Sequence, residues 1–442
     1  MKRFIGNLGG WYLKKADMLI SIRVVCLSRI PKGESSMSAE VFYRAMGVAG
    51  YWVIDAWESR GGEIQVLVEP PRESLQCRAC RSRRVHVHER RRRSWKDTPY
   101  GWKPVTILMQ APRVRCLNCG AKTWPQPTFA EGQKRYTKNF EKFVCGWLSR
   151  VTIQDVVETC GLSWDTVADI DQRRLKRLGR PALPSLKRLA IDEVSVGKLH
   201  RFLTLVYDLD SGAIVSVSKG RGQKALTGFF SRLKRAGVTI RAVATDMAGG
   251  YIAAVMKHLW PTQLVFDRFH VVKLMNDKLS TLRREMYREL KDVQQRDVLK
   301  GVRWLLVKNP ENLKQTPRGD ERSRLAEALK LNEPLAQAYY LKDDLRQFWQ
   351  QSSKTAAAKF LDDWCRRAEA TGIRVLRTMS HTLRGHRVGL LNWYDHPIST
   401  SPLEGTNNKI GLLQRRAYGY RRYDHFKLRL LTLHHAKFTL AG

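Results

Sequence analysis

Hydrophobic and polar positions change their spacing several times along the chain, and each change predicts a different kind of structure. Near the N-terminus, apolar runs at 51–54 and 64–68 flank a pair of glycines, which predicts two strands. From about 135 to 178 the apolar positions recur every three or four residues, which is typical of helices. Short apolar runs return after Leu186 and predict strands with helices between them.

The helical segment contains two closely spaced helices, expected at 152–157 and 164–170. Gly161 lies in the turn between them, and Ser163 is expected to cap the second helix. A supporting helix is expected at 136–148. The arrangement resembles a helix-turn-helix, whose second helix enters the DNA major groove. An ordinary helical hairpin is the alternative.

The segment after Leu186 predicts a mixed sheet with helices packed on it. Its expected order is strand, hairpin, strand, helix, strand, helix, strand. The expected strands are 189–191, 202–207, 214–217, 242–245 and 264–266, and the helix after the hairpin is 225–235. This order resembles the ribonuclease H-like fold of retroviral integrases, so we expect an α/β catalytic domain.

The net charge narrows the range of functions. The 442 residues include 79 Lys and Arg against 41 Asp and Glu, a formal charge of +38. Nucleic acid is the polyanion that best neutralises such a protein. A ribosome-associated protein and a basic enzyme without a polyanionic partner are the alternatives. No apolar run is long enough to span a membrane and no secretory signal is recognisable, so a cytoplasmic, DNA-associated protein is expected.

Four of the eight cysteines form two C-x-x-C pairs, Cys77 with Cys80 and Cys116 with Cys119. Each pair aims two thiolates at one point, and two pairs complete a tetrahedral Zn²⁺ site, so we expect a structural zinc ribbon. His86 and His88 are alternative ligands, although four thiolates already fill the coordination shell. Two unrelated thiol pairs are the competing interpretation. The other four cysteines are expected to be buried free thiols.

The segment around these cysteines is strongly basic. Residues 72–122 carry fourteen Lys and Arg against three acidic residues. A charge run is usually a solvated face, but this one-sided balance indicates phosphate binding. Arg91, Arg92 and Arg93 are the DNA contacts predicted here.

Three of the predicted strands lead directly into a carboxylate: Asp192, Asp246 and Asp267. Phosphodiester cleavage uses two divalent ions, and Mg²⁺ prefers carboxylate oxygens. We therefore expect Asp192 and Asp246 to converge on such a pair of ions from adjacent strand ends. A lone Asp in this position more often caps the next turn, which is the alternative for each of them.

The stretch 401–409 supplies a third carboxylate. Ser401 is expected as the N-cap, Pro402 at the first helical position and Glu404 three residues after the cap, which is the pattern of a capping box. Glu404 either bonds back to Ser401 or reaches a metal ion from the first turn. Interleaved basic, amide and aromatic side chains follow, of which the predicted DNA contacts are Asn408, Lys409, Arg415, Arg416, Tyr418, Arg421 and Arg422.

The 137 positions between Asp267 and Glu404 are far more than a minimal fold of this kind needs, so a helical insertion is expected. Its expected helices are 274–287, 298–307, 322–331, 334–350 and 355–369. The expected domains are a basic extension (1–36), a zinc-ribbon DNA-binding domain (37–130), a helix-turn-helix domain (131–183), the first part of the catalytic domain (184–270), the helical insertion (271–397), and the last catalytic part with a basic C-terminal segment (398–442).

Together these motifs resemble the DDE transposases of bacterial insertion sequences, specifically the ISL-three family. The resemblance covers roughly residues 45–435 in the family's order. It depends on the double C-x-x-C ribbon, the helix-turn-helix, and the stretches AIDE (190–193), ATDM (244–247), FDRFH (266–270), SPLEG (401–405) and RRAYGY (415–420).

The resemblance implies a transposase that binds the terminal inverted repeats of its element, cleaves at the ends and joins 3′-hydroxyls to target DNA. It implies Asp192, Asp246 and Glu404 as catalytic ligands of Mg²⁺ or Mn²⁺. A homodimer or higher oligomer on double-stranded DNA is the expected assembly. Asp267 and His270 are candidate supporting residues beside this triad, and His270 alternatively caps the following helix. The alternatives from other classes are a non-catalytic zinc-ribbon regulator and a structure-specific nuclease of the same fold.

Overall fold

The computed structural model describes residues 46–178, 182–196, 202–316, 319–417, 419–420 and 422–435. The expected N-terminal extension and the predicted DNA contacts Tyr418 and Arg421 lie outside these residues. The chain forms two compact units, Met1–Asp171 and Gln172–Gly442. In the described part of the chain, no helix is both long and apolar enough to cross a membrane.

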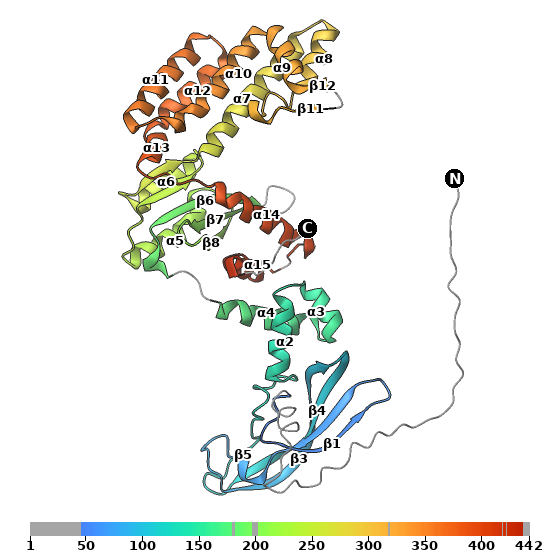
Figure 1. Ribbon diagram of the computed structural model, residues 1–442. Coiled ribbons are helices and arrows are strands. Elements are labelled where there is room, and N and C mark those ends of the chain that lie inside the picture. The colour runs from blue at the N-terminus through green and yellow to red at the C-terminus, as the bar shows by residue number, and fades with distance from the viewer. Residues whose placement is uncertain are drawn as a thin grey trace, which may run out of the picture. The chain divides into compact units, whose positions relative to one another are not determined.

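A five-stranded sheet opens the first unit (Figure 1), with a short 3-10 helix at Arg72–Ser74. Its strands are β1 (Trp52–Glu58), β2 (Ile64–Glu69), β3 (Val85–Tyr100), β4 (Lys103–Cys116) and β5 (Lys122–Thr123). The order is β1-β2-β4-β3, and β5 pairs with β4. The two strands predicted around the glycine pair are confirmed as β1 and β2. The long β3 was not predicted, because its arginine run conceals the alternation that marks a strand.

Three helices follow in the first unit: α2 (Lys138–Leu148), α3 (Ile153–Cys160) and α4 (Trp164–Arg177), the last of which crosses the boundary between the units. The side chain of Thr152 and that of Asp155 form a capping box at the start of α3, and Gly161 ends the helix in the left-handed conformation. Ser163 Oγ accepts a hydrogen bond from the N–H of Thr166, as a cap of α4 does. The predicted helix, turn and capped helix are therefore confirmed as elements.

A second five-stranded sheet lies in the second unit. Its strands are β6 (Arg188–Ser195), β7 (Phe202–Asp208), β8 (Ile214–Lys219), β9 (Ala242–Thr245) and β10 (Gln263–Phe266), preceded by a 3-10 turn at Leu183–Ser185. The order is β10-β9-β6-β7-β8. β7 is antiparallel to β6 and β8, whereas β9 is parallel to β6 and β10 is parallel to β9. The predicted mixed sheet and its chain order are confirmed.

Helices cover both faces of this sheet, and alternate residues of each strand point to opposite faces. Leu189 and Ile191 pack into the cluster that includes α5 (Gln223–Arg235) and α6 (Gly249–Leu259). Ala190 and Val194 pack into the other cluster, which includes α14 (Ser401–Arg416) and α15 (Tyr423–Leu431). A short 3-10 turn, Leu433–His435, follows α15. The central strands are therefore apolar on both sides.

The predicted helical insertion is present between β10 and α14. Its elements are α7 (Arg268–Glu289), α8 (Val293–Gly301), a turn at Pro310–Asn312, the two-residue strands β11 (Gln315–Thr316) and β12 (Gly319–Asp320), α9 (Glu321–Lys330), α10 (Glu333–Leu345), a turn at Arg346–Gln350, α11 (Lys354–Ala370), α12 (Arg374–Gly385), α13 (Arg387–Leu391) and a turn at Asn392–Tyr394. The prediction of a helix at 298–307 was wrong, since α8 ends at Gly301. Arg283 and Arg324 bind the carbonyls of Leu299 and Gly301 at that end.

The last part of the insertion returns to the sheet at β10. Gly389 in α13 lies so close to Phe266 that a Cβ at this position would stand 2.3 Å from the phenyl ring. Asn392 Nδ2 donates to the Leu264 carbonyl at 2.9 Å. These contacts bring the chain back to the sheet edge just before α14 begins.

Candidate functional site

The two C-x-x-C pairs of the first unit fold into turns with the same hydrogen bonds. In the first turn, the N–H of Cys77 donates to Ser82 and the N–H of Arg81 donates back to Cys77. In the second turn, Cys116 at the end of β4 bonds in the same way with Ala121 and Gly120. The fourth residue after each leading cysteine is left-handed, with φ +57° at Arg81 and +69° at Gly120.

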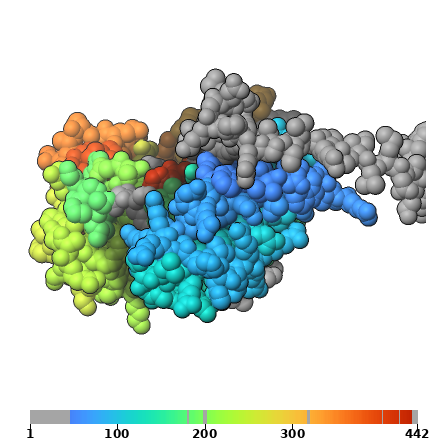
Figure 2. Space-filling model, turned by 90° about the horizontal axis from the view of Figure 1, so that it is seen from below, coloured from blue at the N-terminus to red at the C-terminus, as the bar shows by residue number. Residues whose placement is uncertain are grey.

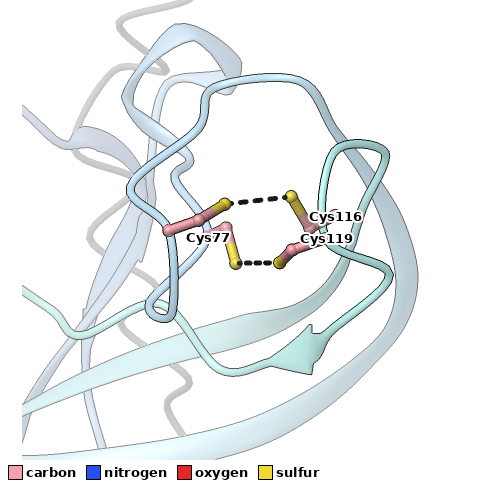
Figure 3. Close-up of side chains that lie close together, drawn as sticks. Cys77, Cys116 and Cys119 are labelled. Atoms are coloured by element: carbon pink, nitrogen blue, oxygen red, sulfur yellow. Dashed lines mark hydrogen bonds between the residues drawn. The ribbon is translucent and has the colours of Figure 1, made fainter.

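The four sulfurs of these turns converge, as Figure 3 shows for Cys77, Cys116 and Cys119. All four Sγ atoms lie within 4.8 Å of one another. Cys77 Sγ lies 3.7 Å from Cys119 Sγ, and Cys80 Sγ lies 3.5 Å from Cys116 Sγ. Such a cluster matches the donor set of a tetrahedral zinc site. His86 and His88 are exposed on β3, and neither belongs to the cluster.

Backbone N–H groups favour the thiolate form of the leading cysteine in each turn. The N–H of Cys80 lowers the pKa of Cys77 to about 6. The N–H of Cys119 likewise lowers the pKa of Cys116. Because a metal ion binds the thiolate rather than the thiol, these turns are prepared for a cation. Of the remaining cysteines, Cys160 and Cys365 are buried and Cys145 is half-buried, while Cys26 lies outside the described residues.

In the second unit, strand register brings the predicted carboxylates into one row. β6 pairs with β9 up to Ala190 and Ala244, and β9 pairs with β10 up to Thr245 and Phe266. The same registers carried forward place Asp192, Asp246 and Asp267 beside one another at the carboxyl ends of β9 and β10. Asp192 was predicted at the end of its own strand, and this was wrong, because β6 continues to Ser195 alongside β7. It lies instead just past the end of the ladder that β6 shares with β9.

Side-chain alternation directs this row toward α14. Asp192 lies between Ala190 and Val194, which both pack on the α14 side of the sheet. Asp192 and Asp246 are half-buried, and their carboxylates accept short-range backbone bonds. Asp192 Oδ1 accepts from the N–H of Glu193 at 2.7 Å, and Asp246 Oδ1 accepts from that of Ala248 at 3.1 Å. Asp246 therefore makes a backbone contact of the kind expected for a capping residue. These backbone contacts leave lone pairs on both carboxylates free to bind a cation.

Glu404 lies on α14, in the first turns of the helix, and its side chain is exposed. Ser401 was predicted as the N-cap of this helix, and that prediction was wrong by one residue. α14 begins at Ser401, so Thr400 is the N-cap, and the Thr400 side chain makes no capping bond. Leu403 and Ile410 are buried against the sheet, and Figure 1 shows α14 beside β6 and β7. The fold therefore brings Glu404 to the sheet face that carries Asp192.

Asn407 makes the direct contact between α14 and the row of carboxylates. Its Nδ2 donates to Asp192 Oδ2 at 2.6 Å. Its Oδ1 accepts from the hydroxyl of Tyr207 on β7 at 3.0 Å. Neither Asn407 nor Tyr207 was among the predicted site residues. The sequence signal that could have indicated Asn407 is its position three residues after Glu404, on the same helix face.

Asp267 connects the start of the insertion with its end. The side chain is fully buried and caps α7 by accepting from the N–H of Phe269 at 3.2 Å. Asp267 Oδ1 also accepts from Ser399 Oγ at 2.7 Å and from the N–H of Thr400 at 3.0 Å. Asp267, not His270, is therefore the cap of α7. His270 lies half-buried in the first turn with its ring against Phe269.

The three predicted catalytic carboxylates are not gathered as tightly as the cysteines. Among the described residues, the four cysteines are the only group of three or more potential ligands whose atoms all lie within 4.8 Å of one another. Asp192, Asp246 and Glu404 do not meet that distance. A site for two ions about 4 Å apart spreads its outer ligands more widely than a site for a single ion does.

Comparison with known proteins assigns both regions. The sequence model of a transposase family, ISL3, matches residues 189–430, and that of the zinc-finger of transposase IS204/IS1001/IS1096/IS1165 matches residues 74–119. The chain belongs to the ISL3 family of transposases. The first match contains all three carboxylates and Asn407, and the second contains the four cysteines and confirms the zinc ribbon.

Two curated relatives of this ISL3-family chain are transposases. The transposase for insertion sequence element IS1001 of Bordetella parapertussis is 31% identical over 390 residues, which cover 87% of this chain and 95% of the relative. The transposase for insertion sequence element IS1557 of Mycobacterium tuberculosis is 31% identical over 79% of this chain and 83% of the relative. A solved structure, the Drosophila P element transposase strand transfer complex, aligns over 70% of this chain and 95% of that chain with 13% identity and a TM-score of 0.34.

The residues predicted to contact DNA lie on both units of this ISL3-family chain. On β3, Arg91 and Arg92 are exposed and point to opposite faces, while Arg93 lies 5.9 Å from the ring centre of Trp124 and its pKa is lowered by burial. Figure 2 shows the surface of this first unit in blue to cyan. In the second unit, the exposed predicted contacts are Asn408, Lys409, Arg415, Arg416 and Arg422.

Proposed function

We propose that this chain is an active DDE transposase that binds the terminal inverted repeats of its insertion sequence, cleaves at the element ends and joins the 3′-hydroxyls to target DNA. The observation that carries the proposal is the row formed by Asp192 and Asp246, with α14 and its Glu404 packed over the same sheet face. The sheet order β10-β9-β6-β7-β8 supports a ribonuclease H-like fold for this domain.

Asp192, Asp246 and Glu404 would hold Mg²⁺ or Mn²⁺, since carboxylate oxygens are the donors that these cations prefer. When bound, two such ions activate the attacking oxygen and stabilise the leaving oxygen of a phosphodiester. The attacking groups are water for cleavage and a DNA 3′-hydroxyl for joining, so no side chain of this site needs to form a covalent bond with DNA.

The basic residues of α14 and of the segment after it would hold the DNA backbone beside this site. Lys409, Arg415 and Arg416 lie on the helix that carries Glu404, and all three are exposed. Contacts of Lys and Arg with phosphates supply affinity without sequence information. They would therefore position a scissile phosphate of any sequence once the ends are bound.

Recognition of the element ends would come from the first unit. The four cysteines fit a structural Zn²⁺, and the ribbon carries a strongly basic surface. The pair α3 and α4, with the left-handed Gly161 between them, supports a helix-turn-helix. In that arrangement α4 would read base edges in the major groove, and the ribbon would add phosphate contacts. Assembly as a homodimer or higher oligomer on DNA would bring two ends together.

The test compares the wild-type chain and Asp192→Asn on DNA that contains the element ends, with Mg²⁺ or Mn²⁺. The wild type is expected to nick at the ends and to join them to a target, whereas Asp192→Asn should lose at least about 10³-fold of this activity and keep end binding. A wild type that binds ends but never cuts would make the chain a non-catalytic regulator. Cutting of branched DNA without end sequences or joining would make it a structure-specific nuclease.

A further inference from the structure

Tyr207, Asn407 and Asp192 form a hydrogen-bonded chain that links β7, α14 and β6. The distances are 3.0 Å from the Tyr207 hydroxyl to Asn407 Oδ1 and 2.6 Å from Asn407 Nδ2 to Asp192 Oδ2. Asn407 lies 200 positions from Tyr207 and 215 from Asp192, so only the tertiary fold brings these groups together.

The direction of each proton in this chain follows from the chemistry of the groups. An ionised carboxylate only accepts hydrogen bonds, so the NH₂ group of Asn407 must face Asp192. The amide oxygen then faces Tyr207, and the hydroxyl of Tyr207 must donate to it. Tyr207 is fully buried, and burial together with the charge of Asp192 raises the pKa of its hydroxyl. Tyr207 thus stays a donor at neutral pH and holds the Asn407 amide in one orientation.

The same contact fixes two of the proposed metal ligands. Asn407 binds one oxygen of Asp192, while the N–H of Glu193 binds the other. Both oxygens are then oriented, and each keeps a lone pair for a cation. Glu404 lies three residues before Asn407 on α14, on the same face of the helix. Any rotation of α14 that moved Glu404 away from Asp192 would break the Asn407 bond.

We propose that Asn407, held in orientation by Tyr207, is a positioning residue that orients Asp192 and keeps Glu404 within reach of the same cations. The proposal rests on the proposed function of the carboxylates. Removal of a group that hydrogen-bonds to a metal ligand typically changes metal affinity or activity by about 10-fold to 100-fold. Asn407 is expected to have an effect of this size.

A purely structural role for Asn407 would give a different result. α14 is already fixed by the buried side chains Leu403 and Ile410 and by the bond from Thr400 to Asp267. Removal of one amide from this interface should leave the helix packed on the sheet, although small rotations of α14 that move Glu404 away from Asp192 would no longer break a hydrogen bond. The effect of Asn407 is therefore expected on cation binding more than on folding.

The experiment uses the full chain and two variants, Asn407→Leu and Tyr207→Phe. Asn407→Leu removes both hydrogen bonds, and Tyr207→Phe keeps the buried ring but removes the donor. The readouts are direct Mn²⁺ binding by electron paramagnetic resonance on the end-DNA complex and the Mn²⁺ or Mg²⁺ dependence of cleavage. Thr406→Val is the matched control, because Thr406 is adjacent to Asn407 on α14 and is half-buried like it.

Asn407→Leu is expected to weaken Mn²⁺ binding about 10-fold or more, and Tyr207→Phe by a smaller factor in the same direction. Thr406→Val is expected to leave Mn²⁺ binding unchanged. Wild-type Mn²⁺ affinity in a folded Asn407→Leu would overturn the inference. If Asn407→Leu does not fold, an unchanged Mn²⁺ affinity in Tyr207→Phe would overturn it. A wild type that binds Mn²⁺ through Asp192 but never cuts would instead contradict the proposed function. In that case the Mn²⁺ affinities of the variants would still test the positioning role of Asn407.

Discussion

The cysteine cluster of the first unit and the carboxylate row of the second are two ligand sets assembled in different ways. Each pair of cysteines is positioned by a turn of six residues that closes its own hydrogen bonds. The carboxylates come from β6, from the end of β9 and from α14, and only long-range packing brings them to one face. The four sulfurs already lie within 4.8 Å of one another, whereas the three carboxylates do not.

The difference has a physical reason. The pKa of Cys77 is lowered to about 6 by the backbone N–H of Cys80. Although the backbone N–H of Ser82 lowers the pKa of Cys80, hydrogen bonds with Cys116 and Cys119 raise this pKa overall. A cluster of thiols that is only partly ionised can pack together before a cation displaces the remaining protons. Carboxylates near neutral pH are charged, and like charges within a few ångströms repel one another. A row of carboxylates is therefore more stable when its members stay apart until cations and DNA are present. The cysteine cluster is a preformed site, whereas the cation site that we propose for the carboxylates would close only when its cations bind.

The largest expected effect tests the preformed character of the zinc cluster. Removal of zinc with a chelator, or Cys116→Ser, should abolish the cooperative unfolding of the first unit, because small zinc modules are unfolded without metal. Circular dichroism and metal analysis measure this. Cys145→Ser, outside the cluster, is the control and should retain zinc. A chain purified without zinc that unfolds cooperatively would contradict the comparison.

The next effect tests the closing of the carboxylate row. Glu404→Gln should reduce cleavage by at least about 10²-fold, since a neutral amide is a weak ligand for Mg²⁺. Its melting temperature should stay within about 2 °C of the wild type, since Glu404 is exposed and surface substitutions are nearly neutral. End cleavage and calorimetry are the measurements. A large loss of stability would show that Glu404 belongs to a preformed structure and not to one that closes on cations.

Asp267→Ala probes the contact that positions α14 before any cation binds. The variant removes a buried acceptor of three hydrogen bonds, from Phe269, Ser399 and Thr400. The second unit is expected to lose about 3 kcal/mol of unfolding free energy, measured by urea denaturation. Asp267→Asn, which keeps one acceptor oxygen, should lose less. Equal stability of all three proteins would show that α14 is held by its apolar contacts alone.

The smallest effect concerns a single turn of the zinc cluster. Gly120 has φ +69° and open space around it, so Gly120→Ala introduces only backbone strain. It should lower the stability of the first unit by about 1 kcal/mol. Gly146→Ala in α2 is the matched control, which should raise stability by about 0.5–1 kcal/mol because it lies in a helix with open space. Thermal unfolding with zinc present measures both.

Local patterns allowed much of the fold to be predicted. The strands and helices around Asp192 and Asp246 were expected from their apolar runs, and the cysteine turns from their spacing. The prediction failed where one pattern concealed another. The arginine run hides the alternation of β3. The helix expected at 298–307 ends at Gly301, where arginines from α7 and α9 bind its last carbonyls. No local pattern contains such partners.

The sequence by itself determined the family, the two types of candidate ligand and the order along the chain of the strands in the second sheet, because each of these depends on residues close together in the chain. The tertiary structure alone decided that β6 continues past Asp192, that Asp267 holds the residues just before α14, and that Asn407 joins Tyr207 to Asp192. These contacts span up to 215 positions, and they form only when packing has brought the two sides of the helical insertion together.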